Sequence, residues 1–504
     1  MEEWLDPLYD AEGMRAADRW AICEQGVPSL ELMEAAGASV AAAAAEVARD
    51  ARAHVVCGKG NNGGDGLVAA RELRRLGFEV EALLLWPAAE LRGDAAANLE
   101  RLADGWREVD LHQVGPALAG SGVVVDAIFG TGFAGAPRAP ADAAIDAING
   151  CGVPVVAADV PSGVDAATGE AAGTAVKSTI TVTFHAAKLG HWIEPGKTLA
   201  GRLRVAPIGI PHGAPAPVAG GLIGDGALAL APRREPSSTK FTSGEVVVIG
   251  GSRGLTGAVC MASEAAIRAG AGYATVAVPA DLEAIFEAKL TEVMSRGFGG
   301  APGRLGSADA ERILAAAERA RAVVLGPGLG REDDSLALAR DLAARIAAPL
   351  VIDADGLNAH AGRLDSLADR ESPAILTPHA GELGRLLGRP STEIAAQRLR
   401  SARAAAERSG ATVVLKGDDT IIADGERLAI SRGGAPALAT AGTGDVLSGV
   451  IAALLARGVE PFAAACAAVH AHQRAGRIAA ERVGAAESVV ATDVIAALPA
   501  ALVP

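Results

Sequence analysis

The chain has 504 residues, of which 50% are hydrophobic and 21% are charged, and its formal net charge is −14. This length exceeds what a single hydrophobic core usually supports, so two or three domains are expected. The acidic balance argues against nucleic acid as a partner, because proteins that bind a polyanion normally present a basic surface.

The five cysteines are isolated and form no C-x-x-C pair, which disfavours a disulfide scaffold or a zinc ribbon and fits a reducing compartment. The N-terminus has no basic region followed by an apolar run, so we expect no signal peptide and a cytoplasmic location. The longest stretch without a charged residue, 205–224, contains four prolines and many glycines and cannot form a membrane helix. No membrane partner is expected.

Short apolar runs alternate with Ala- and Leu-rich helical patterns through most of the chain. The runs show little alternation of polarity, as is typical of strands buried on both faces. This order predicts an α/β fold with parallel sheets covered by helices. The predicted strands are 54–56, 123–129, 153–160, 245–249, 274–278, 322–325, 350–352 and 412–415.

A segment rich in proline and glycine, 211–238, separates two halves. Proline removes hydrogen-bond donors and glycine adds backbone entropy, so this segment is a poor place for a core element. It is either a long surface loop or a domain boundary. A second glycine-rich strand-to-loop motif follows directly, which favours a boundary with domains at 1–212 and 222–504 and a linker at 213–221.

The first half contains HVVCGKGNNGGDG at 54–66, in which an apolar strand leads into glycines and a helical pattern starts at Leu67. Glycine allows backbone N–H groups to approach a ligand, and the start of a helix favours phosphate. Asn61, Asn62 and Asp65 could bind sugar hydroxyls, a cation, or both. The pattern is not G-x-G-x-x-G, so the usual dinucleotide fingerprint is absent.

Two further strands end in polar loops, at 126–135 and 159–163. Ligands of open α/β sheets bind at the carboxyl ends of strands, so Asn62, Asp126 and Ser162 would converge there. Oxygen ligands alone suit a hard cation. Each aspartate taken singly could be a helix or turn cap, but three such loops together favour a binding site.

The motifs NNGGDG, VVDAIFGTG and DVPSG, preceded by LMEAAG at 32–37, resemble those of the NAD(P)H-hydrate epimerase family over residues 1–212. The resemblance implies a Rossmann-like three-layer sandwich and inversion at C6 of the hydrated nicotinamide ring. It also implies a potassium ion bound by Asn62, Asp126 and Ser162. The residues implied to contact the hydrated dinucleotide are Asn61, Asn62, Gly63, Gly64, Asp65, Gly130, Thr131, Gly132, Phe133, Ala134, Gly135, Ala136 and Asp159.

Inversion at C6 needs a group that handles a proton near that carbon. Asp159 is the first candidate and Lys188 is the second. Ala187 stands where the family often has proline, and the alternative for Lys188 is an ordinary surface lysine.

The second half contains a strand and glycine turn at 244–252, followed by GPGLG at 326–330, DADGLN at 353–358, TPHAGE at 377–382, KGDDT at 416–420 and ATAGTGD at 439–445. The N–H groups of 442–444, before a helix predicted from Asp445 to about Leu455, form an anion hole for a transferring phosphoryl group. Asp445 could accept a proton from a substrate hydroxyl or cap the helix.

Other polar residues of this half remain open between roles. Asp353 and Asp355 could reach a metal or cap a helix, and His379 could contact a ligand or cap a helix. His470 and His472 lie two apart on a helical pattern and therefore face different directions, which indicates a structural role.

This set of motifs resembles the ribokinase-like superfamily and, more closely, the ADP-dependent (S)-NAD(P)H-hydrate dehydratase family over residues 222–504. The resemblance implies a ribokinase-like α/β domain in which Asp445 deprotonates the C6 hydroxyl, ADP phosphorylates it, and phosphate leaves as the C5–C6 double bond forms. Magnesium is expected with the nucleotide. The implied hydrate contacts are Ala258, Gly328, His379 and Asp445, and the implied nucleotide contacts are Lys416, Gly417, Asp418, Asp419, Thr420 and Gly444.

The favoured hypothesis is an enzyme with two active sites in series, with NADHX or NADPHX and ADP as small-molecule substrates and with self-association into a homo-oligomer. One alternative is a small-molecule kinase fused to a regulatory domain. The other is a first half that binds a dinucleotide or a protein without catalysis.

Overall fold

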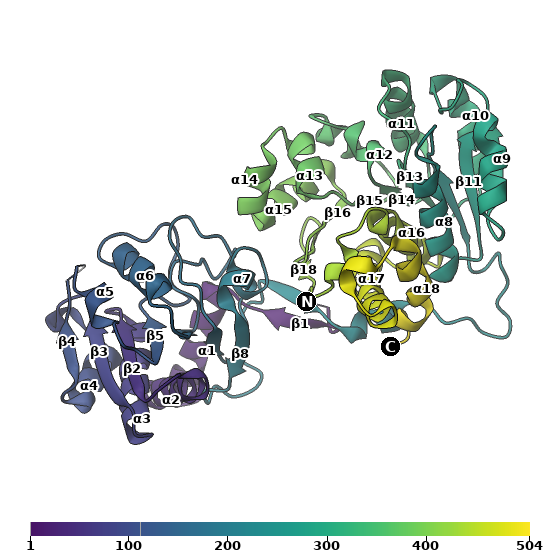
Figure 1. The fold of residues 1–504 in the computed structure, drawn as a ribbon. Coiled ribbons are helices and arrows are strands. Elements are labelled where there is room, and N and C mark those ends of the chain that lie inside the picture. Colours follow the sequence, from purple (N-terminus) through teal and green to yellow (C-terminus); the bar gives the residue numbers. More distant parts are fainter. Residues whose placement is uncertain (1, 111) are drawn as a thin grey trace. The chain divides into compact units, whose positions relative to one another are not determined.

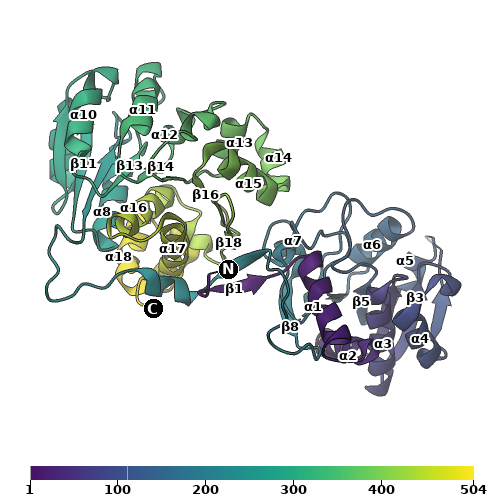
Figure 2. The ribbon, with the colours of Figure 1, turned by 180° about the vertical axis from the view of Figure 1, so that it is seen from behind.

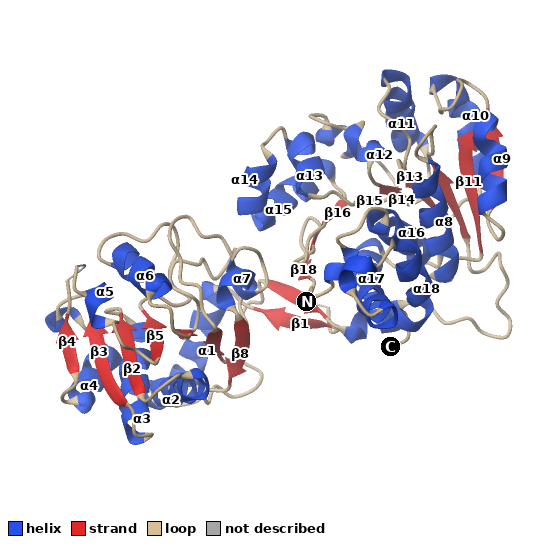
Figure 3. Ribbon diagram, viewed as in Figure 1, coloured by secondary structure: helices blue, strands red, loops and turns tan. Residues whose placement is uncertain are grey.

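The computed structural model describes residues 2–110 and 112–504, which divide into two compact units. One unit is Pro7–Gly220, and the other combines Gly221–Pro504 with the segment up to Asp6. In each unit a central sheet carries helices on both sides (Figure 1; Figure 3). A search of the described residues for a helix long and apolar enough to cross a membrane finds none.

The first unit is built on a seven-stranded sheet in which every neighbouring pair is parallel. Its five inner strands are nearly all buried, as is typical of a parallel sheet covered on both faces, and its two edge strands are more exposed. In spatial order they are β4 (Trp106–Glu108), β3 (Glu79–Leu84), β2 (Arg52–Cys57), β5 (Val123–Ala127), β6 (Val155–Ala158), β7 (Ile180–Phe184) and β8 (Arg202–Ala206).

Two apolar cores, one on each face of this sheet, hold the first unit together. Helices α1 to α4 lie on one side, and α5 and α6 lie on the other (Figure 2). This confirms the predicted Rossmann-like three-layer arrangement. The helices are α1 (Ala11–Cys23), α2 (Ser29–Val47), α3 (Asn61–Arg75), α4 (Gly93–Leu102), α5 (Val114–Ala117), α6 (Ala141–Gly150) and α7 (Gly196–Ala200).

The second unit contains an eleven-stranded mixed sheet. The spatial order is β1 (Leu5–Leu8), β9 (Gly220–Ile223), β18 (Leu428–Ile430), β17 (Ile421–Ala423), β16 (Thr412–Leu415), β15 (Ala374–Leu376), β14 (Leu350–Ile352), β13 (Ala322–Leu325), β10 (Glu245–Ile249), β11 (Tyr273–Pro279) and β12 (Met294–Phe298). In this order, the seven strands from β16 to β12 are parallel. Strands β17 and β18 continue the sheet as an antiparallel hairpin.

One large core packs α8, α16, α17 and α18 against a face of this sheet. Helix α15 contacts β16 and β17. The helices of this unit are α8 (Thr256–Arg268), α9 (Glu283–Lys289), α10 (Ala310–Ala317), α11 (Asp333–Arg345), α12 (Asp355–Asn358), α13 (Ala380–Leu387), α14 (Ser391–Ala396), α15 (Arg398–Ser409), α16 (Thr443–Ala456), α17 (Pro461–Val483) and α18 (Ala491–Ala501).

The prediction that the helix after the first glycine motif begins at Leu67 is wrong, because α3 already begins at Asn61. The glycines of NNGGDG are thus in the helix, where close packing requires them. A Cβ on Gly63 would lie 1.9 Å from the carbonyl oxygen of Gly58, and one on Gly66 would lie 2.6 Å from the Cβ of Ala127. Helix α16 likewise begins two residues before the predicted Asp445.

The segment 205–224, which contains the predicted linker 213–221, includes the end of β8 and all of β9. Strand β9 lies between β1 and β18 in the second unit's sheet. Gly221 is needed there for close approach, since its Cβ would lie 2.6 Å from the Cβ of Leu5. The glycines at 220–221 therefore mark a tightly packed strand and not only a flexible connection.

Candidate functional site

A cavity of about 730 Å³ lies at the carboxyl ends of β2, β5 and β6 in the first unit. Gly63 and Gly64 are not among its lining residues, because both face packed neighbours. Gly135 and Ala136 are also outside the lining. The predicted residues that line it are Asn61, Asn62, Asp65, Gly130, Thr131, Gly132, Phe133, Ala134, Asp159 and Lys188.

The centre of this cavity wall is a buried ion pair between Lys188 and Asp159. The Nζ of Lys188 donates to Asp159 Oδ1 at 2.7 Å, to Thr183 Oγ1 at 2.7 Å and to the carbonyl of Phe184 at 3.1 Å. Lys188 is only 1% exposed, which rules out the surface-lysine alternative. Its proposed catalytic role stays a prediction.

The carboxylate of Asp159 is held in its ionised form. Burial raises its pKa, but the Lys188 charge and hydrogen bonds from Lys188 and Thr131 outweigh burial and bring the pKa well below the usual range. The Thr131 backbone N–H donates to Asp159 Oδ2 at 2.9 Å. At neutral pH, Asp159 is therefore a fixed anion.

The backbone of Asp159 is also constrained, with a positive φ of 66° that non-glycine residues rarely adopt. The backbone N–H of Lys188 donates to His191 Nδ1 at 3.1 Å, so the proton of a neutral His191 is on Nε2 and points at the Asp159 carbonyl at 2.9 Å. Burial, and then the Lys188 charge, lower the pKa of His191 to about 4, which keeps it neutral. His191 thereby supports the strained backbone.

Two more carboxyl groups of the cavity wall have raised pKa values, whereas the pKa of Asp159 is lowered. Burial raises the pKa of Asp65 well above its usual range, and the charges of Asp159 and Asp18 raise it further. Burial also raises the pKa of Asp18, although Lys188 opposes the shift. The cavity therefore places a carboxyl group that favours its proton, Asp65, near a carboxylate that does not, Asp159.

Of the three residues predicted to bind potassium, Asn62 lines the cavity, and Asp126 and Ser162 lie outside its lining. The hydroxyl of Ser162 donates to Asp126 Oδ1 at 2.6 Å and its backbone N–H donates to Oδ2 at 2.8 Å. Asp126 is fully buried, and burial raises its pKa to about 6. The Nδ2 of Asn62 is buried without a hydrogen-bond partner. The carboxylate of Asp126 and the hydroxyl of Ser162 are oxygen ligands of the kind that suit a hard cation.

Sequence reasoning missed the cavity wall contributed by α1, where Met14, Arg15 and Asp18 line the space. It also missed Lys59 and Trp86. The helix carries no glycine motif, so its only signal was an acidic residue on an amphipathic helix, which also describes most solvent-facing helices.

A second cavity, of about 280 Å³, lies in the second unit between the KGDDT loop, the start of α16 and helix α17. Asp419 differs from its neighbours, since its carboxylate accepts from Arg398 Nε at 2.7 Å and lies outside the lining. The ion pair of Arg398 and Asp419 is buried and fixes the KGDDT loop on a side that does not line the cavity. The predicted nucleotide contacts that line this cavity are Lys416, Gly417, Asp418, Thr420 and Gly444.

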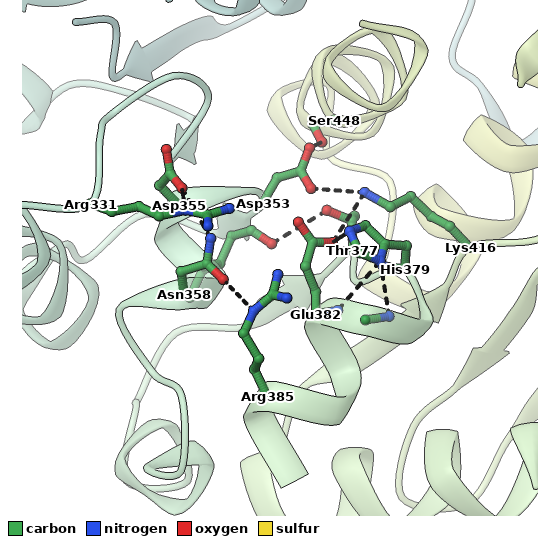
Figure 4. A network of polar contacts seen from close by, with 12 residues as sticks. Arg331, Asp353, Asp355, Asn358, Thr377, His379, Glu382, Arg385, Lys416 and Ser448 are labelled. Atoms are coloured by element: carbon green, nitrogen blue, oxygen red, sulfur yellow. Dashed lines mark hydrogen bonds and ion pairs between the residues drawn. The ribbon is translucent and has the colours of Figure 1, made fainter. Parts of the chain in front are cut away.

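Lys416 connects this cavity to a network of polar residues (Figure 4). Its Nζ donates to Asp353 Oδ1 at 3.1 Å and lies 3.7 Å from Glu382 Oε2. The hydroxyl of Ser448 on α16 donates to Asp353 Oδ2 at 2.7 Å. A Cβ on Gly444 would lie 3.4 Å from the same Nζ, so the ammonium group is next to the N–H groups that begin α16.

Asp445, in the first turn of α16, has its pKa raised to about 7. Burial is the main cause, the charge of Asp353 adds to it, and Lys416 opposes it. A carboxylate with this pKa can accept a proton near neutral pH. The side chain is partly exposed beside the cavity and is not sealed among apolar neighbours.

Two of the predicted hydrate contacts of this unit, His379 and Asp445, interact with Glu382. The Cβ of Ala258 would be 3.4 Å from a Cβ on Gly328, so these two residues are adjacent. His379 caps α13, because its Nδ1 accepts from the N–H of Gly381 at 3.0 Å, while its ring stays exposed. The capping alternative is thus correct for His379, and ligand contact stays a prediction.

Two residues of α17 that sequence reasoning did not place at a ligand, His472 and Gln473, line the second cavity. Burial lowers the pKa of His472 to about 4. His470 is bonded to Asp225 at 2.7 Å, as its structural interpretation expects. Only the packing of α17 against α16 reveals the cavity role of His472.

Comparisons with known proteins cover both units. A family model described as NAD(P)H-hydrate dehydratase matches residues 246–500, and one described as YjeF-related protein N-terminus matches residues 29–190. The bifunctional NAD(P)H-hydrate repair enzyme Nnr of Moorella thermoacetica is 41% identical over 98% of this chain and 96% of its own length. The bifunctional NAD(P)H-hydrate repair enzyme Nnr of Salinibacter ruber is 40% identical over 99% of this chain and 96% of its own length.

Among solved structures, the ADP/ATP-dependent NAD(P)H-hydrate dehydratase of Bacillus subtilis, co-crystallised with ATP and Mg²⁺, covers 55% of this chain and 95% of its own. The two are 30% identical with a TM-score of 0.47.

The buried ion pair of the first cavity leads to a stability prediction. Lys188→Met leaves the carboxylate of Asp159 buried without its cation, so it should lower the free energy of unfolding by about 3–5 kcal/mol. Adding Asp159→Asn should recover part of this loss, because the unpaired charge is removed. Urea denaturation of the two single variants and the double variant measures the coupling.

The control for this cycle is Lys59→Met, which removes the exposed pair of Lys59 with Glu90 at 2.9 Å. It should cost less than about 1 kcal/mol. Equal losses for Lys188→Met and Lys59→Met, or strict additivity in the double variant, would contradict the assignment of Lys188 as the counter-ion of Asp159.

Proposed function

The chain belongs to the family of bifunctional NAD(P)H-hydrate repair enzymes, and we propose that its two units catalyse successive reactions on the same metabolite. The Pro7–Gly220 unit interconverts the R and S forms of NAD(P)HX at C6. The unit that contains Gly221–Pro504 dehydrates the S form to NAD(P)H at the expense of ADP, with AMP and phosphate as products.

The observation that carries the proposal is the same in both units. At the carboxyl ends of the parallel strands, a cavity meets a lysine that is paired with a carboxylate, and a carboxyl group with a displaced pKa lies nearby. Groups whose pKa values are moved apart by their surroundings are suited to act as acid and base in one reaction.

In the first unit, C6 of the hydrate carries a hydroxyl group and is bonded to the ring nitrogen N1. Protonation of the hydroxyl by Asp65 lets it leave as water, while the lone pair of N1 forms the N1–C6 double bond. Water then adds to the other face of C6 and gives up a proton to a carboxylate of the cavity wall. Asp159, kept ionised by Lys188, stabilises the positive charge of the ring.

We propose that potassium binds to Asp126, Asn62 and Ser162. The buried carboxylate of Asp126 accepts hydrogen bonds from Ser162 and Ile128 and pairs with no cation among the described residues, which supports this assignment. A bound cation would fix the loop that contains Gly130 and Thr131, since a Cβ on Gly130 would lie 2.9 Å from Asn62 Oδ1.

In the second unit, Asp445 removes the proton from the C6 hydroxyl, and the hydroxyl oxygen attacks the terminal phosphorus of ADP. The bond from that phosphorus to the bridging oxygen breaks, and AMP leaves with the electron pair. Phosphate then departs from C6 with its bonding electrons as a proton is lost from C5. The N–H groups at the start of α16 and the Lys416 ammonium stabilise the charge on the transferred group.

Magnesium fits this site only together with the nucleotide. Among residues 2–110 and 112–504, no group of three His, Cys, Asp or Glu side chains is arranged to hold a metal alone. The carboxylates of Asp353, Glu382 and Asp445 nevertheless surround one lysine, and this excess of negative charge suits a divalent cation that arrives with phosphate oxygens. Such an ion would neutralise the nucleotide phosphates.

Separate loss of the two activities tests the proposal. Asp159→Asn should abolish interconversion of the R and S hydrates, while ADP-dependent formation of NADH from the S hydrate continues. Asp445→Asn should have the opposite effect. Absorbance at 340 nm follows the dehydratase, and chromatographic separation of the epimers follows the epimerase.

Wild-type protein that phosphorylates a small alcohol but never restores NADH would favour the kinase alternative. If it dehydrates the S hydrate and leaves the R hydrate untouched, the first unit is a binding module.

Potassium should stabilise the first unit in a way that depends on Asp126. Replacing tetramethylammonium by potassium at constant ionic strength should raise the melting temperature of the wild type, because a ligand of the folded state adds to stability by mass action. Asp126→Asn should abolish this rise and the stimulation of the epimerase. Equal melting temperatures of the wild type in the two salts would contradict a potassium site.

The raised pKa of Asp445 predicts how the dehydratase responds to pH. A general base must be deprotonated, so kcat/KM for the hydrate should fall as pH drops below about 7. Glu382 raises the pKa of Asp445, so Glu382→Gln should move the midpoint of this fall to lower pH. A midpoint that stays in place or moves upward in Glu382→Gln would count against Asp445 as the base.

A further inference from the structure

Two exposed arginines, Arg331 and Arg385, belong to the polar network of the second unit but have no part in the chemistry described above (Figure 4). Arg331 follows the GPGLG loop after β13, and Arg385 lies on α13. The side chain of Arg331 is 69% exposed. Exposed arginines are usually mobile, so fixed partners at both of them are informative.

Each arginine is held in place by a hydrogen bond that its Nε–H donates. Arg331 Nε donates to Asp355 Oδ1 at 3.0 Å, and Arg385 Nε donates to Asn358 Oδ1 at 2.8 Å. Asn358 Nδ2 donates to the same Asp355 Oδ1 at 3.0 Å. A continuous chain of hydrogen bonds therefore joins the two guanidinium groups, and their terminal nitrogens take part in none of its bonds.

The anchor of this chain is rigid. Asp355 is only 8% exposed, and its second oxygen accepts from the backbone N–H of Gly330 at 3.1 Å. Figure 4 shows the two arginines on either side of Asp355 and Asn358. Their guanidinium groups are thus held in place before any ligand arrives, which lowers the entropy cost of binding.

The two arginines lie near residues that are predicted to contact the hydrate, and they lie outside the cavity that is predicted to hold the nucleotide. A Cβ on Gly381 would lie 2.9 Å from His379 Cε1 and 3.8 Å from Arg385 Nη1, so Arg385 is next to His379. Arg331 is three residues after Gly328. Neither arginine lines the cavity between the KGDDT loop and α17. The charge of Lys416 is already opposed by Asp353 and Glu382.

We propose that Arg331 and Arg385 form a phosphate-binding subsite that holds the hydrated dinucleotide in the second unit. This inference rests on the proposed function. A hydrated dinucleotide carries a pyrophosphate, and NADPHX also carries a ribose 2′-phosphate. Guanidinium groups present paired N–H donors that match phosphate oxygens, which a lone ammonium group does not.

The test uses Arg331→Gln, Arg385→Gln and the double variant in the full chain. At saturating ADP, the KM for (S)-NADHX and for (S)-NADPHX is measured by the appearance of absorbance at 340 nm, and the KM for ADP is measured at saturating hydrate. Each single variant should raise the KM for the hydrate by about tenfold or more, because a charged hydrogen bond to phosphate is lost. The values of kcat and the KM for ADP should change little.

Two further variants separate binding from folding. Arg408→Gln, which removes an exposed arginine paired with Asp365 at 2.7 Å in the same unit, should leave every KM unchanged. Arg331→Lys and Arg385→Lys retain the positive charge but lack the paired N–H donors of a guanidinium group. Each should give a KM for the hydrate between those of the wild type and the Gln variants. A purely structural role would instead lower the melting temperature and leave the KM of the folded fraction unchanged.

The two hydrates distinguish the source of the phosphate. A rise in KM for both supports contact with the pyrophosphate, and a rise for NADPHX alone supports contact with the 2′-phosphate. An unchanged KM for both hydrates, or a rise confined to ADP, overturns the subsite while the proposed function stands. Wild-type protein that dehydrates neither hydrate overturns the proposed function and the subsite with it.

Discussion

The requirement that governs both units is charge balance in places that water hardly reaches. Each sheet brings several carboxyl groups to the carboxyl ends of its strands, and each unit places one lysine among them. Lys188 is buried against Asp159 and Thr183, and Lys416 lies between Asp353 and Glu382. Removing the buried cation Lys188 would leave Asp159 as an uncompensated buried anion, so this lysine contributes to stability as well as to the site.

The same clusters decide which carboxyl groups keep a proton. Asp159 lies against Lys188 and stays ionised, whereas burial and the charges of Asp159 and Asp18 raise the pKa of Asp65. Burial and the charge of Asp353 raise the pKa of Asp445 to about 7, although Lys416 opposes the shift. The pKa values of chemically identical aspartates therefore move in opposite directions, because burial and neighbouring charges differ from one to the next.

The sequence predicted much of the fold and many of the residues that line the two cavities. Strands β10, β13, β14 and β16 have the predicted bounds because unbroken apolar runs indicate strands buried on both faces. The start of α3 was misplaced because glycine marks both loops and close contacts between helix and strand, and only neighbours distant in sequence distinguish them. The wall formed by Asp18 and the cavity role of His472 depend on how helices pack, for which neither helix carries a motif.

The second unit is discontinuous in sequence, since the segment up to Asp6 belongs with Gly221–Pro504. Strand β1 lies at the edge of the sheet beside β9, and β9 in turn pairs with β18 at 429–430. During synthesis on the ribosome, the strand that emerges first must wait for more than 200 residues until its neighbour is made, and that neighbour must wait for a similar length. The sheet of the second unit can thus be completed only after the whole first unit has left the ribosome, and a gene cut at residue 221 would encode a fragment that lacks an edge strand.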